Sequence, residues 1–133
     1  MWDVDYEGMY DDVWKLRNDA DKLADLLRDD YESDINDWCR MAKIGEILSG
    51  LMDSIISCQD WDLFLYKMES DKDKFEVQKM IKYQMEKLYR HVERPINIAR
   101  IWKMKDYRCI NFQNRMEALF VRIQEEIQEA IKK

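Results

Sequence analysis

Apolar side chains recur along residues 9–31 at alternating steps of four and three, and this spacing most constrains how the chain can fold. An α-helix brings residues three and four apart onto one face, whereas a strand alternates its faces at every residue. The spacing predicts a helix from about Tyr6 to Tyr31, which ends before Asp34 because that residue would return to the apolar face. The stripe is predicted to be core and consists of Met9, Val13, Leu16, Ala20, Leu23, Leu27 and Tyr31.

A second helix is predicted from Ser33 or Asp34, either of which can cap it, to Cys58. It is apolar around more than half of its circumference, which favours a central position in the fold. Its small residues, Ala42, Gly45 and Ser49, predict close approach of a neighbouring backbone. Its apolar residues are Ile35, Trp38, Met41, Ile44, Leu48, Leu51, Met52 and Ile55.

The stretch 57–60 is the clearest predicted turn, because Asp60 can cap a new helix that begins at Trp61. Another helix start is predicted at Ser70, where the following aspartates suit the positive end of a helix dipole. A regular stripe then follows, made of Val77, Ile81, Met85, Leu88 and Val92.

Pro95 should stop, kink or restart that helix, because proline lacks a backbone N–H and restricts the preceding residue. The next dozen residues have no clean period. Asp106 or Asn111 then opens a final helix, whose stripe is Phe112, Met116, Leu119, Ile123, Ile127 and Ile131.

The fold class predicted from these patterns is all-α. Three glycines and one proline in 133 residues leave few helix breakers. A chain of this length can bury a core without disulfides or metals. We expect one domain, residues 1–133, folded as an antiparallel helical bundle of four to five helices.

The predicted location is the cytoplasm. The three cysteines, at 39, 58 and 109, are an odd number without short spacing, so they are interpreted as core residues in a reducing compartment. The first eight residues carry acids where a signal peptide has positive charge followed by an apolar run. The most apolar stretch, 44–58, is interrupted by Glu46 and Asp53, so no membrane span is predicted.

Charge is distributed unevenly along the chain. Residues 1–37 hold 13 acids and 4 bases, a net charge of −9, whereas residues 79–115 hold 3 acids and 10 bases, a net charge of +7. These opposite charges are balanced either inside the molecule, where the acidic helix lies against the basic segment, or by a charged partner.

Trp14 lies almost opposite the apolar stripe of the first helix, among aspartates. A tryptophan on an acidic face is typical of an interaction anchor, because it offers a large contact area at low entropic cost. The alternative is that a second helix of the same molecule covers it. The predicted partner-binding residues are Asp11, Trp14, Asp21, Asp25 and Asp29.

The basic segment 79–115 carries interleaved aromatic residues and has the composition of a nucleic-acid surface. Against this stands the acidic isoelectric point, near 4.9, since the acidic segment would repel phosphate unless it faces away. Internal pairing with the first helix is therefore the favoured interpretation. The residues of the alternative nucleic-acid surface are Lys79, Lys82, Arg90, Arg100, Lys103, Lys105 and Arg108.

His91, the single histidine, belongs to no complete catalytic motif. With Glu93 and Pro95 it matches the start of the zinc deaminase signature, but the C-x-x-C that completes the metal site is missing. A Cys–His nucleophilic pair would need a cysteine brought close in space. The predicted role of His91 is packing at the edge of its helix.

Two carboxylate pairs, Asp34 with Asp37 and Glu126 with Glu129, have a spacing suited to magnesium. Such pairs arise easily in a chain with 28 acidic residues. The sequence therefore predicts no bound metal, no cofactor and no enzyme activity.

Three hypotheses for function follow. The first is a non-enzymatic protein that docks its acidic helix on a basic surface of a nucleic-acid-handling protein, as an inhibitor that imitates nucleic acid. Anti-defence and immunity proteins act in this way as a class. The second is a helical accessory subunit of a nucleoprotein complex that binds RNA or DNA through residues 79–115. The third is a scaffold or homo-oligomer.

Overall fold

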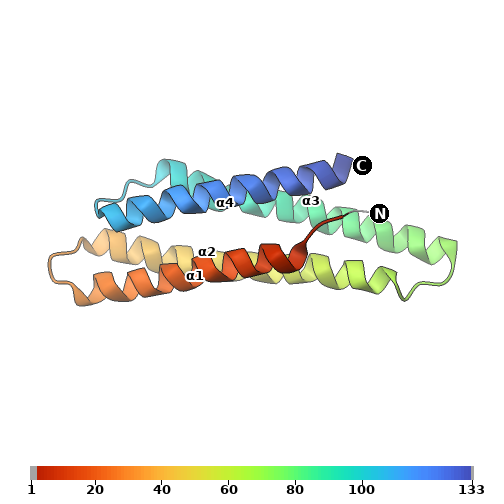
Figure 1. The fold of residues 1–133 in the computed structure, drawn as a ribbon, viewed down its shortest axis with the longest axis horizontal. Coiled ribbons are helices and arrows are strands. Elements are labelled where there is room, and N and C mark those ends of the chain that lie inside the picture. The colour runs from red at the N-terminus through yellow and green to blue at the C-terminus, as the bar shows by residue number, and fades with distance from the viewer. Residues whose placement is uncertain (1–2, 133) are drawn as a thin grey trace.

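The computed structural model describes residues 3–132 and shows four helices packed against one another (Figure 1). Within these residues there is no strand, so the predicted all-α bundle is confirmed with four helices. The neighbouring pairs are α1–α2, α2–α3 and α3–α4, and the α1–α4 contact is less extensive. Helix α2, predicted to be central, packs extensively against both α1 and α3. The helices are α1 (Tyr6–Asp29), α2 (Ile35–Leu65), α3 (Asp71–Ile101) and α4 (Tyr107–Lys132).

The three connecting loops are short and lie at the two ends of the molecule. The α1–α2 and α3–α4 loops share one end (Figure 1). The α2–α3 loop lies at the other end, where α2 and α3 extend beyond α1 and α4. These long helices leave a protruding hairpin whose apolar side chains include the exposed Leu63, Phe64, Tyr66 and Phe75.

Helix α1 begins at its cap Asp5, whose carboxylate accepts a hydrogen bond from the Gly8 N–H at 2.9 Å. The predicted stripe from Met9 to Leu27 is buried. The prediction that Tyr31 is the last buried residue of this stripe is wrong. The helix ends at Asp29, Asp30 takes an extended conformation, and Tyr31 is fully exposed in the loop.

Helix α2 is capped by Asp34, as predicted, but it continues to Leu65 through the predicted turn at 57–60. The turn prediction is wrong because packing holds this stretch in the helix. Cys58 is buried and its Sγ lies 3.4 Å from the Gln84 carbonyl of α3, and Leu65 is buried about two turns further on. Ile35, predicted to be apolar contact surface, is exposed in the first turn.

Helix α3 starts at the predicted cap Ser70 and runs through Pro95 to Ile101. Of the predicted stop, kink or restart at Pro95, the stop and the restart are therefore wrong. Pro95, Ile96 and Ile98 are buried, and this packing favours continuation of the helix. Helix α4 starts after Asp106, one of the two predicted positions.

Two of the three cysteines are core residues as predicted. Cys58 and Cys109 are buried, whereas Cys39 is exposed. The prediction fails for Cys39 because Asp37 and Met41, each two positions away, face the interior, and two positions turn a helix by about 200°.

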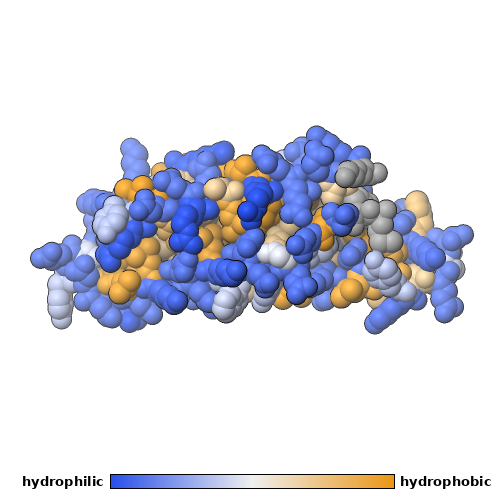
Figure 2. All heavy atoms as spheres, viewed as in Figure 1, coloured by the Kyte–Doolittle hydropathy of each residue, from blue (hydrophilic) through white to orange (hydrophobic). Residues whose placement is uncertain are grey.

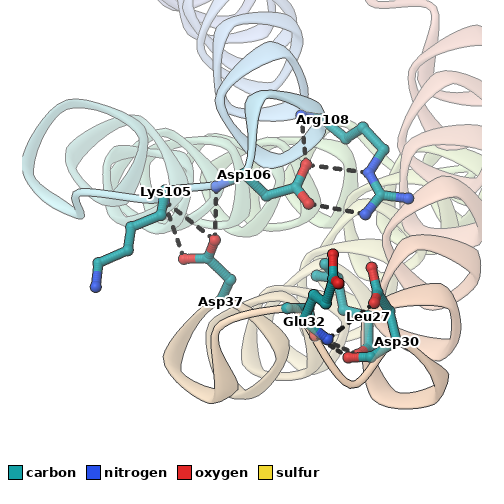
Figure 3. A network of polar contacts seen from close by, with 8 residues as sticks. Leu27, Asp30, Glu32, Asp37, Lys105, Asp106 and Arg108 are labelled. Carbon is teal, nitrogen blue, oxygen red and sulfur yellow. Dashed lines mark hydrogen bonds and ion pairs between the residues drawn. The ribbon is translucent and has the colours of Figure 1, made fainter.

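Asp37 is a carboxylate that the apolar pattern does not predict to be buried, yet it is only 1% exposed. Its oxygens accept hydrogen bonds from the backbone N–H groups of Lys105 and Asp106, the shortest at 2.8 Å (Figure 3). Asp106 in turn accepts two hydrogen bonds from the Arg108 guanidinium. Asp37 therefore joins the start of α2 to the loop that leads into α4.

Two glycines of α2 provide a matched stability test. We expect Gly50→Ala to raise the free energy of unfolding by about 0.5–1 kcal/mol, because alanine favours a helix and a Cβ there meets nothing within 4 Å. Gly45→Ala should raise the free energy of unfolding by less, because the new Cβ would lie 2.7 Å from the Asp21 carboxylate of α1. Chemical denaturation of both variants, with and without Asp21→Ala, measures the difference. Equal gains while Asp21 is present would contradict this account.

Candidate functional site

The outward face of α1 is open to solvent. Helix α1 packs extensively against α2 and less extensively against α4, and the side that carries Trp14 is partly exposed. Trp14 is 45% exposed on that side, so it is not covered as the alternative interpretation predicted. Hydrophilic side chains dominate the face formed by α1 and α4, with patches of apolar atoms along its middle (Figure 2).

The other four predicted partner-binding residues are all exposed aspartates: Asp11, Asp21, Asp25 and Asp29. Three of them contact arginines of their own helix. Arg17 lies 3.6 Å from Asp21, and Arg28 lies 3.4 Å from Asp25 and 3.3 Å from Asp29. Exposed pairs of this kind contribute about 0–1 kcal/mol each. A competing cation could therefore replace these arginines at low cost.

Helix α4 neutralises a different part of α1. Arg115 pairs with Asp19 at 2.6 Å and Arg122 with Asp12 at 2.7 Å, on the side where α1 and α4 meet. Internal pairing of the acidic helix is thus real but partial. Asp11, Trp14, Asp25 and Asp29 remain exposed, whereas the exposed Asp21 lies toward α2, where its carboxylate would be 2.7 Å from a Cβ at Gly45. Of the two arginines, Arg115 alone comes from the basic segment 79–115.

The predicted nucleic-acid surface is dispersed over the molecule. Four of its seven residues sit in ion pairs: Lys79 with Glu76, Arg100 with Glu117, Lys105 with Asp34 and Arg108 with Asp106. Within residues 3–132, the other three, Lys82, Arg90 and Lys103, are in no ion pair. They extend from the middle of α3 to the α3–α4 loop, so the seven do not form one positive surface.

A hollow of about 500 Å³ lies between α2 and α3, on a part of the molecule that includes only one predicted site residue, Arg90. Arg94 follows Arg90 by one helical turn, and this spacing is the sequence signal that could have indicated the site. The position of α2 opposite them could not be read from the sequence. The lining residues are Lys43, Glu46, Ile47, Gly50, Leu51, Ser54, Arg90, His91 and Arg94.

His91 contacts α2 through Ser54, whose Oγ lies 3.1 Å from His91 Nδ1. Partial burial lowers the pKa of His91, and the cations of Lys87 and Arg90 lower it further. The histidine is exposed rather than packed at the helix edge as predicted. A serine–histidine nucleophile also needs a group that orients the histidine, and the hydrogen bonds of the described residues give His91 only Ser54.

The buried thiols are poorly suited to nucleophilic chemistry. Burial raises the pKa of Cys58 to about 12, and burial likewise raises the pKa of Cys109 to about 12. Both thiols therefore stay protonated near neutral pH, whereas the thiolate is the reactive form.

Three of the four carboxylates in the predicted magnesium-type pairs have structural contacts. Asp34 caps α2 and pairs with Lys105 at 3.0 Å, and this hydrogen bond with Lys105 lowers the pKa of Asp34. Asp37 accepts backbone hydrogen bonds, as described above, and Glu126 accepts one from the N–H of Asp5. No cluster of three or more possible metal ligands occurs within residues 3–132.

Comparisons of the chain with protein-family models, with curated proteins and with solved structures find no match. None of the helices in residues 3–132 has the length and apolar character needed to cross a membrane.

Proposed function

We propose that this chain is a non-enzymatic acidic protein-binding module. In this proposal it is a single-domain antiparallel bundle that docks the open face of α1 on a basic surface of a nucleic-acid-handling protein, most simply as an inhibitor that imitates nucleic acid. The single observation that carries the proposal is Trp14, a large aromatic left 45% exposed among uncovered carboxylates.

The shape of the α1 face supports this function. Asp21, Asp25 and Asp29 are spaced by four residues, which places them about 6 Å apart along a rigid helix axis. A regular row of negative charge on a fixed support can imitate a row of phosphates and steer a basic partner into place. Trp14 then supplies apolar contact area that charge alone lacks.

The electrostatic arrangement also favours a basic partner. The pairs of Arg17 and Arg28 with these aspartates are exposed and weak, so arginines of a partner can compete for the same carboxylates. The shorter contacts of Asp12 and Asp19 with α4 lie to the side of the face, where α1 and α4 meet. Such docking is expected to weaken as salt is added.

The accessory-subunit alternative has less support. A nucleic-acid surface needs cations that act together, whereas four of the seven predicted residues are engaged in ion pairs and the set is dispersed. Self-association remains the third possibility, with the apolar hairpin between α2 and α3 as its natural contact.

Quantitative affinity purification tests the proposal. The wild-type chain should retain one or a few nucleic-acid-binding proteins from its natural host, and double-stranded DNA or added salt should displace them. Trp14→Ala combined with Asp25→Lys should reduce retention at least tenfold, because it removes the anchor and reverses one charge of the row. Far-UV circular dichroism checks that the variant remains helical.

The control changes the same kinds of residue elsewhere. Tyr66→Ala with Glu69→Lys removes an exposed aromatic and reverses one charge near the α2–α3 loop, and it should retain the same proteins as the wild type. If the α1 variant stays helical and binds as well as this control, the assignment of α1 fails. Loss of binding in the control alone, with dimers detected by light scattering, would favour self-association.

A further inference from the structure

Three adjoining hollows lie along α3, and two of them form a groove between α2 and α3. The central one, of about 500 Å³, shares Arg90 and Arg94 with a second of about 370 Å³ and shares Ser54 with a third of about 210 Å³. The central volume lies in the range of small-molecule sites, roughly 300–1,000 Å³. It lies away from α1, so what it binds is independent of the function proposed for the acidic face.

The charges in the middle of this groove are poorly balanced. Lys87, Arg90 and Arg94 form no ion pair within residues 3–132, although they are three and four positions apart on α3. Like charges at this spacing repel each other on a helix. On the α2 side, Lys43 is paired with Glu46 at 3.3 Å. An anion placed over α3 would relieve this repulsion.

Neutral groups complete the site. The Ser54 hydroxyl and the His91 ring lie 3.1 Å apart and provide hydrogen-bonding groups beside the arginines. Ile47 and Leu51 supply an apolar wall, and Gly50 leaves open space where any other residue would place a side chain. Cations next to an apolar wall suit a ligand with one anionic and one organic part.

We propose that this groove binds a small organic phosphate, with the phosphate held by Arg90, His91 and Arg94 and the organic part against Ile47, Gly50 and Leu51. Arginine is suited to this role because its planar fork of N–H donors matches phosphate oxygens.

Carboxylates at both ends of the groove favour a compact ligand over a nucleic-acid strand. Asp53 lines the hollow on one side of the centre and Glu93 lines the hollow on the other side. The cations Lys87, Arg90 and Arg94 span only about 10 Å of α3 at 1.5 Å per residue, and Glu93 already lies beside the last of them. The phosphates of a longer strand would meet these carboxylates.

His91 makes the proposal directly measurable, since it is the only histidine in the sequence and its ring gives an unambiguous NMR signal. In the free protein, partial burial and the cations Lys87 and Arg90 lower its pKa. A phosphate bound beside the ring adds negative charge and should raise that pKa. The groove is also lined by three charged side chains of α2, namely Lys43, Glu46 and Asp53.

The experiment titrates the full chain with AMP and, separately, with inorganic phosphate, at constant ionic strength. We expect saturable binding, a raised His91 pKa, and tighter binding of AMP than of inorganic phosphate. Arg90→Gln and Arg94→Gln should each weaken binding of both at least tenfold. Lys82→Gln is the matched control, because Lys82 is an exposed cation of α3 outside the groove, and it should change neither affinity.

Gly50→Leu separates the two parts of the ligand. A leucine should fill the apolar side of the groove without altering its charge, and it favours the helix, so the variant is expected to fold. The variant should weaken the binding of AMP more than the binding of inorganic phosphate.

Three results would overturn the proposal. One is unchanged binding in both arginine variants. Another is a shift of the His91 pKa by AMP that is no larger than the shift caused by sulfate at equal ionic strength. The third is an oligonucleotide that binds more tightly than AMP and depends on Lys103 and Arg108, which would indicate an extended nucleic-acid surface instead.

Discussion

Asp37→Ala is expected to lower the free energy of unfolding by about 3 kcal/mol, because it removes a buried acceptor and leaves two backbone N–H groups without a partner. The carboxylate accepts from Lys105 and Asp106 at 2.8–3.2 Å and is 1% exposed, so water cannot easily replace it. Urea denaturation followed by far-UV circular dichroism measures the change. Asp37→Asn keeps one oxygen and the side-chain volume, so an intermediate loss is expected.

Asp29→Ala is the control for this prediction. Asp29 is an exposed aspartate whose one ion pair, with Arg28, is also exposed, and its removal should change the free energy of unfolding by no more than about 0.5 kcal/mol. Amide hydrogen exchange gives a local measure. The backbone N–H groups of Lys105 and Asp106 should exchange faster in Asp37→Ala than in the wild type, and their exchange rates should be unchanged in Asp29→Ala. Equal stability losses in the two variants would show that the buried hydrogen bonds contribute little.

Phe120→Ala is expected to cost about 3–5 kcal/mol of folding free energy, because it removes a large side chain from the core and leaves a cavity. Phe120 is fully buried on the inward face of α4, next to the predicted stripe residue Leu119, which is only half-buried. Phe75→Ala makes the same chemical change on α3, where the ring is 57% exposed and its described cation contact is with Lys79. The loss there should be below about 1 kcal/mol, since an exposed cation–π contact contributes about 0.5–1 kcal/mol.

Thermal and urea denaturation of the two phenylalanine variants provide the comparison. The difference between them isolates burial, because the atoms deleted are the same. A loss at Phe75 as large as the loss at Phe120 would mean that the hairpin end of α3 is covered in solution. That outcome would support self-association through the hairpin.

Local signals predicted much of the fold because helix caps and apolar stripes are properties of neighbouring residues. Asp34 and Ser70 cap their helices as predicted, since a short side-chain acceptor next to an apolar period is stable in few other arrangements. The stripes of α1 and α4 face the core for the same reason. The residues of the α1 face were likewise recognised as the side opposite the stripe.

The sequence-based predictions fail where contacts between residues distant in sequence determine the local structure. The stretch 57–60 has turn-forming composition, but burial of Cys58 and Leu65 keeps it helical. Helix α3 continues through Pro95 because residues on both sides of it pack into the core. The position of Asp37 also depends on the α3–α4 loop, which is 68 residues away in sequence.

Sequence alone determined the all-α class, most of the inward-facing stripes and the uneven distribution of charge, since each depends on composition or on spacing along one segment. Only the tertiary structure decided which charges meet. It placed Arg115 and Arg122 beside Asp19 and Asp12, left Trp14 open to solvent, and brought α2 against Arg90, His91 and Arg94 to form a groove. The physical reason is that pairing and exposure depend on which helices become neighbours, and the packing of whole faces decides that.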